Sequence, residues 1–251
     1  MSVYSICFSP TGGTQRVANI VGKEFFVNKF IDLTKQIDFS NYEFNEEDIC
    51  IISVPSFGGR VPFVATERIS QLKGNGAKAI IIAVYGNRAY EDTLLELKNT
   101  VSECGFKVVS AMAAVAQHSL LDQFASGRPD GQDEKEIRDF AKRIQTKLAN
   151  EDYSTVEVPG NVPYKEFSGV PILPKTSRKC QKCGRCILKC PVGAIPSERP
   201  RKLDKDKCIS CMRCVAFCPE NAKTVSRWKL RVAGKKLVEA CSERKQNEFY
   251  I

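Results

Sequence analysis

The sequence is poor in histidine and tryptophan and has no long apolar segment. His118 is the only histidine and Trp228 the only tryptophan among 251 residues. A lone histidine is more often structural than functional. No cysteine lies beside His118 in the sequence, so a catalytic thiol activated by histidine is not expected. No stretch is long and apolar enough to cross a bilayer, and the N-terminus lacks the basic and apolar regions of a secretory leader. We therefore expect a cytoplasmic protein without a membrane span.

Cysteine, by contrast, is abundant, with twelve in the chain. Eight of them form two runs that each read C-x2-C-x2-C-x3-C-P: Cys180, Cys183, Cys186 and Cys190 in the first run, and Cys208, Cys211, Cys214 and Cys218 in the second. Three thiolates at this spacing can hold one corner of a cubane cluster, while the short loops between them offer N–H groups to the sulfurs. Zinc would require a longer gap between ligand pairs, and disulfides would require a secreted chain. The two runs therefore predict iron–sulfur clusters in a reducing, oxygen-poor cytoplasm.

Residues 178–225 resemble a bacterial two-cluster 4Fe–4S ferredoxin. In such proteins the fourth cysteine of each run ligates the other cluster. The resemblance thus implies two clusters with crossed ligand sets: Cys180, Cys183, Cys186 and Cys218 for one, and Cys208, Cys211, Cys214 and Cys190 for the other.

The net charge of +9 is unevenly distributed. From Lys175 to the end there are 20 Lys and Arg against 7 Asp and Glu, which leaves the rest of the chain at −4. Nucleic acid is one interpretation of a basic half. Iron–sulfur clusters explain the positive charge better, because each oxidised cubane with its thiolates carries a charge of about −2, which nearby Lys and Arg offset. Trp228 is interpreted as core packing rather than base stacking, so we expect no nucleic acid among the partners.

The first part of the chain alternates apolar strands with amphipathic helices. Strands are predicted at 3–8, 29–33, 49–54, 79–84 and 106–117, and helices at 14–26, 62–72, 91–104 and 133–150. Continuous apolar strands alternating with helices are typical of a doubly wound parallel α/β sheet. Ligands bind such sheets at the carboxyl ends of the strands.

A loop rich in hydroxyl groups follows the first strand. It contains Ser9, Thr11, Gly12, Gly13 and Thr14, directly before a helix. A strand, a tight glycine loop and a helix N-terminus form an anion site. No Lys follows the glycines, so the loop is not a P-loop, and it is not a dinucleotide fingerprint either. Hydroxyl groups without a cation suit a phosphate monoester, and the pattern resembles the phosphate loop of flavodoxins.

Two further loops at strand ends combine aromatic residues with glycine. They supply the other candidate cofactor residues: Ser56, Phe57, Gly58 and Gly59 in one loop, and Tyr85, Gly86, Asn87 and Tyr90 in the other. Glycine lets backbone approach a flat ring on which an aromatic side chain can stack. The flavodoxin resemblance implies that these loops hold FMN, with the strand order 2-1-3-4-5. His118 is interpreted as structural, with flavin contact as the alternative, and residues 119–132 as a cover over the site.

The complete chain resembles the flavodoxin–ferredoxin fusion proteins of anaerobic prokaryotes. The expected organisation is a flavodoxin-like α/β domain at 1–150, a linker at 151–177, a small α+β two-cluster domain at 178–225 and a basic, partly helical tail at 226–251. The resemblance implies electron transfer between two 4Fe–4S clusters and FMN. The alternatives are a flavin-dependent reductase of a small molecule fed by the clusters, and a domain that keeps the fold without flavin. For partners we expect a redox protein as donor or acceptor, and we allow for a homodimer.

Overall fold

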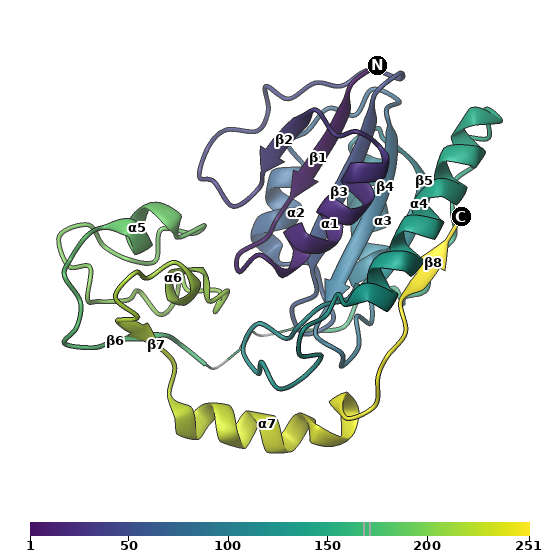
Figure 1. The fold of residues 1–251 in the computed structure, drawn as a ribbon. Helices are drawn as coiled ribbons and strands as arrows, with labels where there is room; N and C mark the ends of the chain where they lie inside the picture. Colours follow the sequence, from purple (N-terminus) through teal and green to yellow (C-terminus); the bar gives the residue numbers. More distant parts are fainter. Residues whose placement is uncertain (168, 171) are drawn as a thin grey trace.

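A six-stranded sheet forms the centre of the computed structural model, which describes residues 1–167, 169–170 and 172–251. Its strands lie in the order β2-β1-β3-β4-β5-β8 (Figure 1). Their bounds are β1 (Val3–Cys7), β2 (Lys29–Asp32), β3 (Ile49–Pro55), β4 (Lys78–Tyr85), β5 (Lys107–Val115) and β8 (Glu248–Tyr250). The first five strands are parallel and β8 is antiparallel to β5. The order 2-1-3-4-5 is that of flavodoxin-like doubly wound sheets, so the predicted fold class is confirmed.

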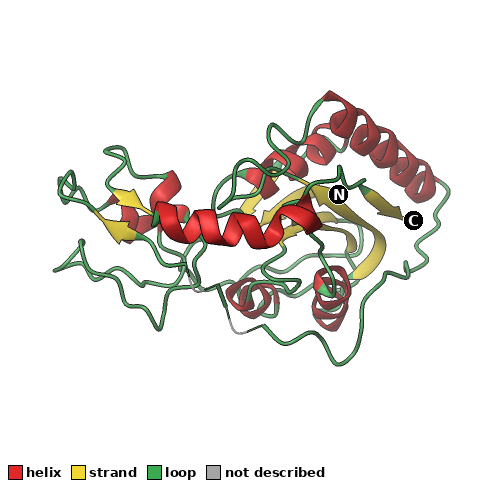
Figure 2. Ribbon diagram, turned by 90° about the horizontal axis from the view of Figure 1, so that it is seen from below, coloured by secondary structure: helices red, strands yellow, loops and turns green. Residues whose placement is uncertain are grey.

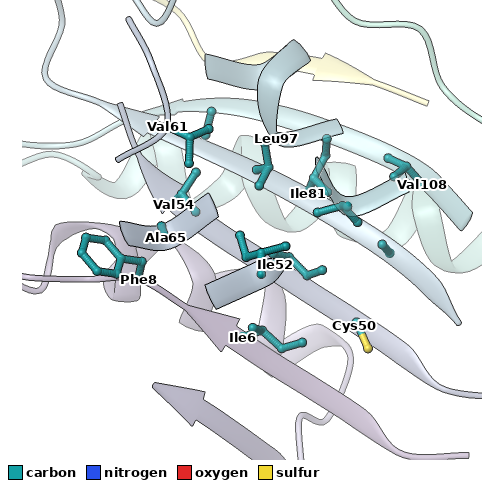
Figure 3. Close-up of a cluster of buried hydrophobic side chains, with 14 of the residues drawn as sticks. Ile6, Phe8, Cys50, Ile52, Val54, Val61, Ala65, Ile81, Leu97 and Val108 are labelled. Carbon is teal, nitrogen blue, oxygen red and sulfur yellow. The ribbon is translucent and has the colours of Figure 1, made fainter. Parts of the chain in front are cut away.

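Helices cover both faces of the sheet because neighbouring strand residues point in opposite directions. On β4, Ile81 belongs to one core and Ile80 and Ile82 to the other. The first core is closed by α2 (Phe63–Ile69) and α3 (Thr93–Glu103), as Figure 3 shows for Leu97 above Ile81. The second is closed by α1 (Gly13–Glu24) and α4 (Gly131–Ala149). Burial on both faces explains why these strands are continuous apolar runs.

A smaller unit carries the two cysteine runs. A two-residue antiparallel ribbon pairs β6 (Lys175–Thr176) with β7 (Lys223–Thr224). Each run contains a short helix before its fourth cysteine, α5 (Arg185–Lys189) in the first run and α6 (Arg213–Ala216) in the second. The segment before β6 packs on the larger domain, where the N–H groups of Asn161 and Lys165 donate to the carboxylate of Asp92. Ser168 and Pro171 of the predicted linker lie outside the described residues.

The C-terminal segment returns from the small unit to the large sheet. Helix α7 (Arg227–Cys241) runs between the two parts of the molecule (Figure 2), and the chain then enters β8. Leu230, Ala233 and Leu237 of α7 pack against Leu121 and Phe124. The sequence predicts the helix but not the strand. Trp228, interpreted above as core packing, is 70% exposed, so that interpretation is wrong. No helix in the described part of the chain has the length and apolar character to span a bilayer.

A buried polar network fixes the C-terminal segment to the sheet domain. Arg128 donates two hydrogen bonds to Asp133, at 2.9 and 2.5 Å, and a third to the carbonyl of Lys245. Asn247 donates to Asp133 at 2.9 Å and accepts from the N–H of Val115. Because both Arg128 and Asp133 are almost fully buried, their charges need these partners. The network closes the open edge of the sheet beside β5.

Candidate cofactor sites

A pocket opens at the carboxyl ends of the parallel strands. The loops after β1, β3, β4 and β5 line it on one side, and the small unit lines it on the other. Its lining includes Thr11, Gly13, Thr14, Ser56, Phe57, Gly58, Tyr85, Gly86, His118, Val170, Ser210 and Cys211. Parallel strands end together at this edge, which is where doubly wound sheets bind ligands.

The loop after β1 offers unpaired donors to an anion. Gly12 adopts a left-handed conformation (φ 98°), which turns the chain into α1. Ser9 Oγ accepts a hydrogen bond from the N–H of Gln15 at 3.0 Å. Within the described residues, no protein acceptor pairs with the N–H groups of residues 11–14. Free N–H groups at the start of a 12-residue helix fit a phosphate group.

The loop after β3 is a tight turn that brings backbone to the pocket. The N–H of Phe57 donates to the carbonyl of Arg60, and both intervening glycines have positive φ, 63° for Gly58 and 92° for Gly59. A Cβ atom on Gly58 would lie 2.3 Å from the ring of Phe167. Ser56, Phe57 and Gly58 line the pocket, whereas Gly59 does not. Gly58 and Gly59 therefore allow the tight turn, and Gly58 also lets the ring of Phe167 approach the backbone closely.

The loop after β4 divides between the pocket and the C-terminal segment. Tyr85 and Gly86 line the pocket. Asn87 instead donates to the carbonyls of Cys241 and Glu243 and accepts from the N–H of Lys245. The hydroxyl of Tyr90 donates to Glu248 at 2.6 Å. These two predicted cofactor residues thus hold the C-terminal segment and do not line the pocket in this structure.

The hydroxyl of Tyr85 contacts the C-terminal segment, although the residue also lines the pocket. It donates to the carbonyl of Gln246 at 3.2 Å. Burial raises the pKa of Tyr85 to about 12, and the charge of Glu248 adds to the effect. Tyr85 is therefore neutral at physiological pH.

His118 lies at the pocket wall, packed against the loop after β4. Its Nδ1 accepts hydrogen bonds from the N–H groups of Leu120 and Leu121, both at 3.2 Å. A Cβ atom on Gly86 would lie 2.7 Å from the imidazole ring, so the ring needs glycine there. Burial lowers the pKa of His118, and the nearby cation Arg88 lowers it further. The imidazole is therefore neutral at pH 7. Its hydrogen bonds fit the structural interpretation, and contact with flavin stays a prediction.

Three cysteines of the first run and Cys218 of the second surround one cavity; they are called the first group below. Cys180, Cys183, Cys186 and Cys218 all line it, together with Lys223. Burial raises the pKa of Cys186, the charge of Lys223 lowers it, and Cys180 and Cys218 raise it again. Cys218 accepts a hydrogen bond from the N–H of Ala222 at 3.2 Å. Backbone N–H groups aimed at sulfur fit a thiolate that ligates a cluster.

The other three cysteines of the second run, Cys208, Cys211 and Cys214, are grouped with Cys190 and form the second group. Burial raises the pKa of Cys211 to about 12, and the neighbouring Cys190, Cys214 and Cys208 add to this. The sulfur of Cys190 accepts from the N–H of Ala194 at 3.3 Å. In the described residues, no three His, Cys, Asp or Glu side chains converge on a single ion. A cubane spans four iron atoms, so its ligands stand farther apart than those of one ion.

The two groups differ in exposure and in distance from the pocket. Cys190 and Cys214 are buried, whereas Cys183 is exposed. Cys211 lines the same pocket as Thr14 and Tyr85. The second group therefore lies against the sheet domain, and the first group lies toward solvent.

Arg213, between Cys211 and Cys214 in the sequence, connects the two parts. Its buried guanidinium donates to the carbonyls of Ser9 at 2.9 Å and Pro10 at 3.2 Å, and it lies 3.7 Å from the carboxylate of Asp32. No local pattern in the sequence marks Arg213, Ser210 or Val170, because contacts between domains leave none. A buried arginine at this place joins the second cysteine run directly to the loop after β1.

Comparison with known proteins supports the assignment of the small unit. Residues 165–223 match the family model described as a 4Fe-4S dicluster domain. No curated protein matches the chain at a significant level.

Several solved structures are similar to the sheet domain. They include a flavodoxin from the domain Archaea (13% identity, TM-score 0.42, covering 59% of this chain and 99% of that one). A flavodoxin from Streptococcus pneumoniae TIGR4 has 19% identity and a TM-score of 0.41, covering 58% and 99%. Oxidised Flavodoxin 2 from Bacillus cereus has 13% identity and a TM-score of 0.43, covering 59% and 99%. The fold assignment itself rests on the strand order. The chain thus joins a sheet domain of flavodoxin-like order to a segment that matches a 4Fe–4S dicluster domain.

Proposed function

We propose that this chain, a flavodoxin-like domain joined to a dicluster segment, transfers electrons between two 4Fe–4S clusters and an FMN bound in the pocket. One observation carries the proposal: Cys211, a predicted cluster ligand, lines the same pocket as the loop after β1. A cluster held by Cys211 would lie at the edge of the flavin site. Placing both cofactors on one chain replaces a diffusional encounter with a fixed contact.

The residues around the pocket fit FMN. The unpaired N–H groups of residues 11–14 and the hydroxyls of Thr11 and Thr14 would hold the phosphate. The turn at Gly58 and the rings of Phe57 and Tyr85 would flank the isoalloxazine. Bound FMN supplies a centre that takes one or two electrons, while the clusters supply one-electron carriers. The protein's own contribution is to fix their separation, access and electrostatic surroundings.

The exposed end of the relay lies at the first cysteine run, and we infer an acidic redox protein as its partner. Cys183 is exposed, and so are the cations that surround it in sequence: Lys175, Arg178, Lys179, Lys182, Arg185 and Lys189. Residues 175–197 contain no Asp or Glu. Leu188, 86% exposed, adds an apolar contact within this basic surface. Complementary charge would steer an acidic carrier to this end.

The structure favours a carrier over a reductase of a small molecule. Val170, Ser210 and Cys211 cover the pocket from the side of the small unit. A small-molecule substrate would need open space next to the bound flavin. Val170, Ser210 and Cys211 occupy the side of the pocket that faces the small unit, so they would restrict its access. The reductase therefore remains the second candidate, to be tested by turnover with small acceptors.

An anaerobic reconstitution tests the proposal. We would quantify iron, sulfide and FMN, and then follow cluster and flavin absorbance after rapid mixing with dithionite. We expect about eight irons and one FMN per chain, with the clusters reduced first and the flavin following at a rate independent of dithionite concentration. Full iron without FMN binding would contradict the flavin site, and flavin reduction that scales with dithionite throughout would contradict the internal relay.

A further inference from the structure

The two cysteine runs are structural repeats of each other. Cys180 to Ile195 corresponds to Cys208 to Lys223, residue by residue. Left-handed backbone recurs at matching positions: Lys182 and Ser210, Gly184 and Met212, Gly193 and Asn221. The N–H of Ala194 donates to Cys190 just as that of Ala222 donates to Cys218. Corresponding residues therefore occupy equivalent surroundings.

At the end of the repeat a buried isoleucine is matched by a buried lysine. Ile195 is 3% exposed and Lys223 is 4% exposed. An apolar side chain thus suffices at this position in one half, and packing does not explain a charge in the other. Burying an ammonium group is costly unless an anion lies nearby.

The contacts of Lys223 do not include a carboxylate. Its Nζ donates to Thr176 Oγ1 at 2.8 Å and to the carbonyl of Pro200 at 3.0 Å, both neutral acceptors. Within the described part of the chain, no Asp or Glu forms an ion pair with it. An ammonium group has three donors, so one is left. The buried charge lacks its counter-ion in the protein alone.

Cysteines of both groups lie within electrostatic reach of this ammonium group. Lys223 lines the cavity of the first group together with Cys180 and Cys218. Its charge acts on Cys186 of the first group and on Cys208 and Cys214 of the second. The missing anion is therefore available from either cluster, each of which carries a net negative charge with its thiolates.

We propose that Lys223 is a potential-setting residue shared by both clusters. Its fixed positive charge stabilises the electron added to either cluster, and so raises both reduction potentials together. Because one charge serves both, it raises the two potentials without separating them, which keeps the transfer of an electron between clusters reversible. This inference rests on the proposed presence of two clusters, which the iron content of the unaltered protein tests separately.

The test compares reduction potentials in neutral and charged variants. Lys223→Ile copies the residue that the first repeat already accommodates, Lys223→Met keeps the length, and Lys223→Arg keeps the charge. Lys205→Met, at an exposed lysine between the two cysteine runs, is the matched control. Anaerobic redox titration followed by electron paramagnetic resonance measures the potentials of reconstituted protein.

We expect the Ile and Met variants to hold full iron and to show both potentials lowered. The equilibrium constant for reduction should fall roughly tenfold, or about 59 mV for one electron. The reduction potentials of Lys223→Arg and Lys205→Met should stay near those of the unaltered protein. Loss of iron in both neutral variants but not in Lys223→Arg would support the same electrostatic role. Unchanged potentials in loaded neutral variants, or equal iron loss in all three Lys223 variants, would overturn it.

Discussion

The guanidinium group of Arg213 donates a hydrogen bond to the backbone carbonyl of Ser9 at 2.9 Å, across the boundary between the two parts of the molecule. Arg213 lies in the second cysteine run, and Ser9 begins the loop that we assign to the FMN phosphate. The contact couples the positions of the predicted cluster ligands Cys211 and Cys214 to the position of the proposed phosphate loop. Its counterpart in the first repeat, Arg185, is exposed. The docking contact is thus specific to one half of the repeat.

Arg213→Met should weaken the contact between the small unit and the loop after β1 of the sheet domain. The carbonyls of Ser9 and Pro10 would lose a charged donor, and a hydrogen bond to a charged group contributes about 1.5–3 kcal/mol. We expect electron transfer from the clusters to FMN to slow at least tenfold in rapid-mixing experiments, with iron content unchanged. Arg185→Met is the control and should transfer at the normal rate. Equal rates in both variants would contradict the docking role.

Thr14→Val tests the phosphate assignment. The residue is buried and lines the pocket at the start of α1. Loss of a hydroxyl donor to a charged phosphate should weaken FMN binding roughly tenfold, given about 1.5 kcal/mol for such a bond. Riboflavin lacks the phosphate, so its affinity should not change. Flavin fluorescence quenching measures both affinities, and a parallel loss for FMN and riboflavin would place the phosphate elsewhere.

Gly86→Ala should displace the imidazole of His118. The added Cβ atom would lie 2.7 Å from the ring, closer than packed carbon atoms allow. We expect FMN affinity to fall at least tenfold, because the ring forms part of the pocket wall. Gly131→Ala is a suitable control, since nothing lies within 4 Å of its added Cβ. An unchanged dissociation constant for Gly86→Ala would show that FMN does not reach this wall.

The titration of His118 can be followed directly because it is the only histidine. Its folded pKa is lowered, chiefly by burial, from an ordinary value of about 6.5. At a pH between the folded and the unfolded pKa of His118, the unfolded chain binds more protons than the folded chain. The stability that neutral His118 contributes is therefore present above about pH 6.5 and is lost as the pH falls through the folded pKa. NMR of ¹³C-histidine-labelled, oxidised protein should give a midpoint below 6.5, and a midpoint above it would contradict the buried position.

Asn87→Ala separates two roles for a residue that the sequence predicts to bind cofactor. In the structure its side chain bonds to Cys241, Glu243 and Lys245. Loss of the buried Asn87 amide should lower the free energy of unfolding by about 2–3 kcal/mol. This corresponds to a melting temperature roughly 4–12 °C lower. FMN affinity below the transition should not change. A lower FMN affinity with normal melting would instead support the cofactor role.

The sequence predicted the features that arise from local patterns. The parallel strands were recognisable as continuous apolar runs. Residues such as Ile80, Ile81 and Ile82 are all buried, alternately on the two faces of the sheet. The cysteine runs were recognisable because spacing along the chain determines which thiolates meet. Strand β8 was missed, since three residues of mixed polarity carry no period. The roles of Asn87, Tyr90 and Arg213 depend on partners up to 204 residues away, which no local pattern records.

Strand β8 makes the sheet domain discontinuous in sequence. Its first five strands precede the cysteine runs and its sixth follows them, so the small unit is an insertion between β5 and β8 rather than an appendage. Both ends of the insertion are tied to one rigid sheet. A fragment cut within residues 151–177 would expose the β5 edge, and unpaired edges promote aggregation. Separating the two redox units by simple truncation would therefore damage the sheet domain, whereas joining the end of α4 to β8 through a linker would keep all six strands and α4.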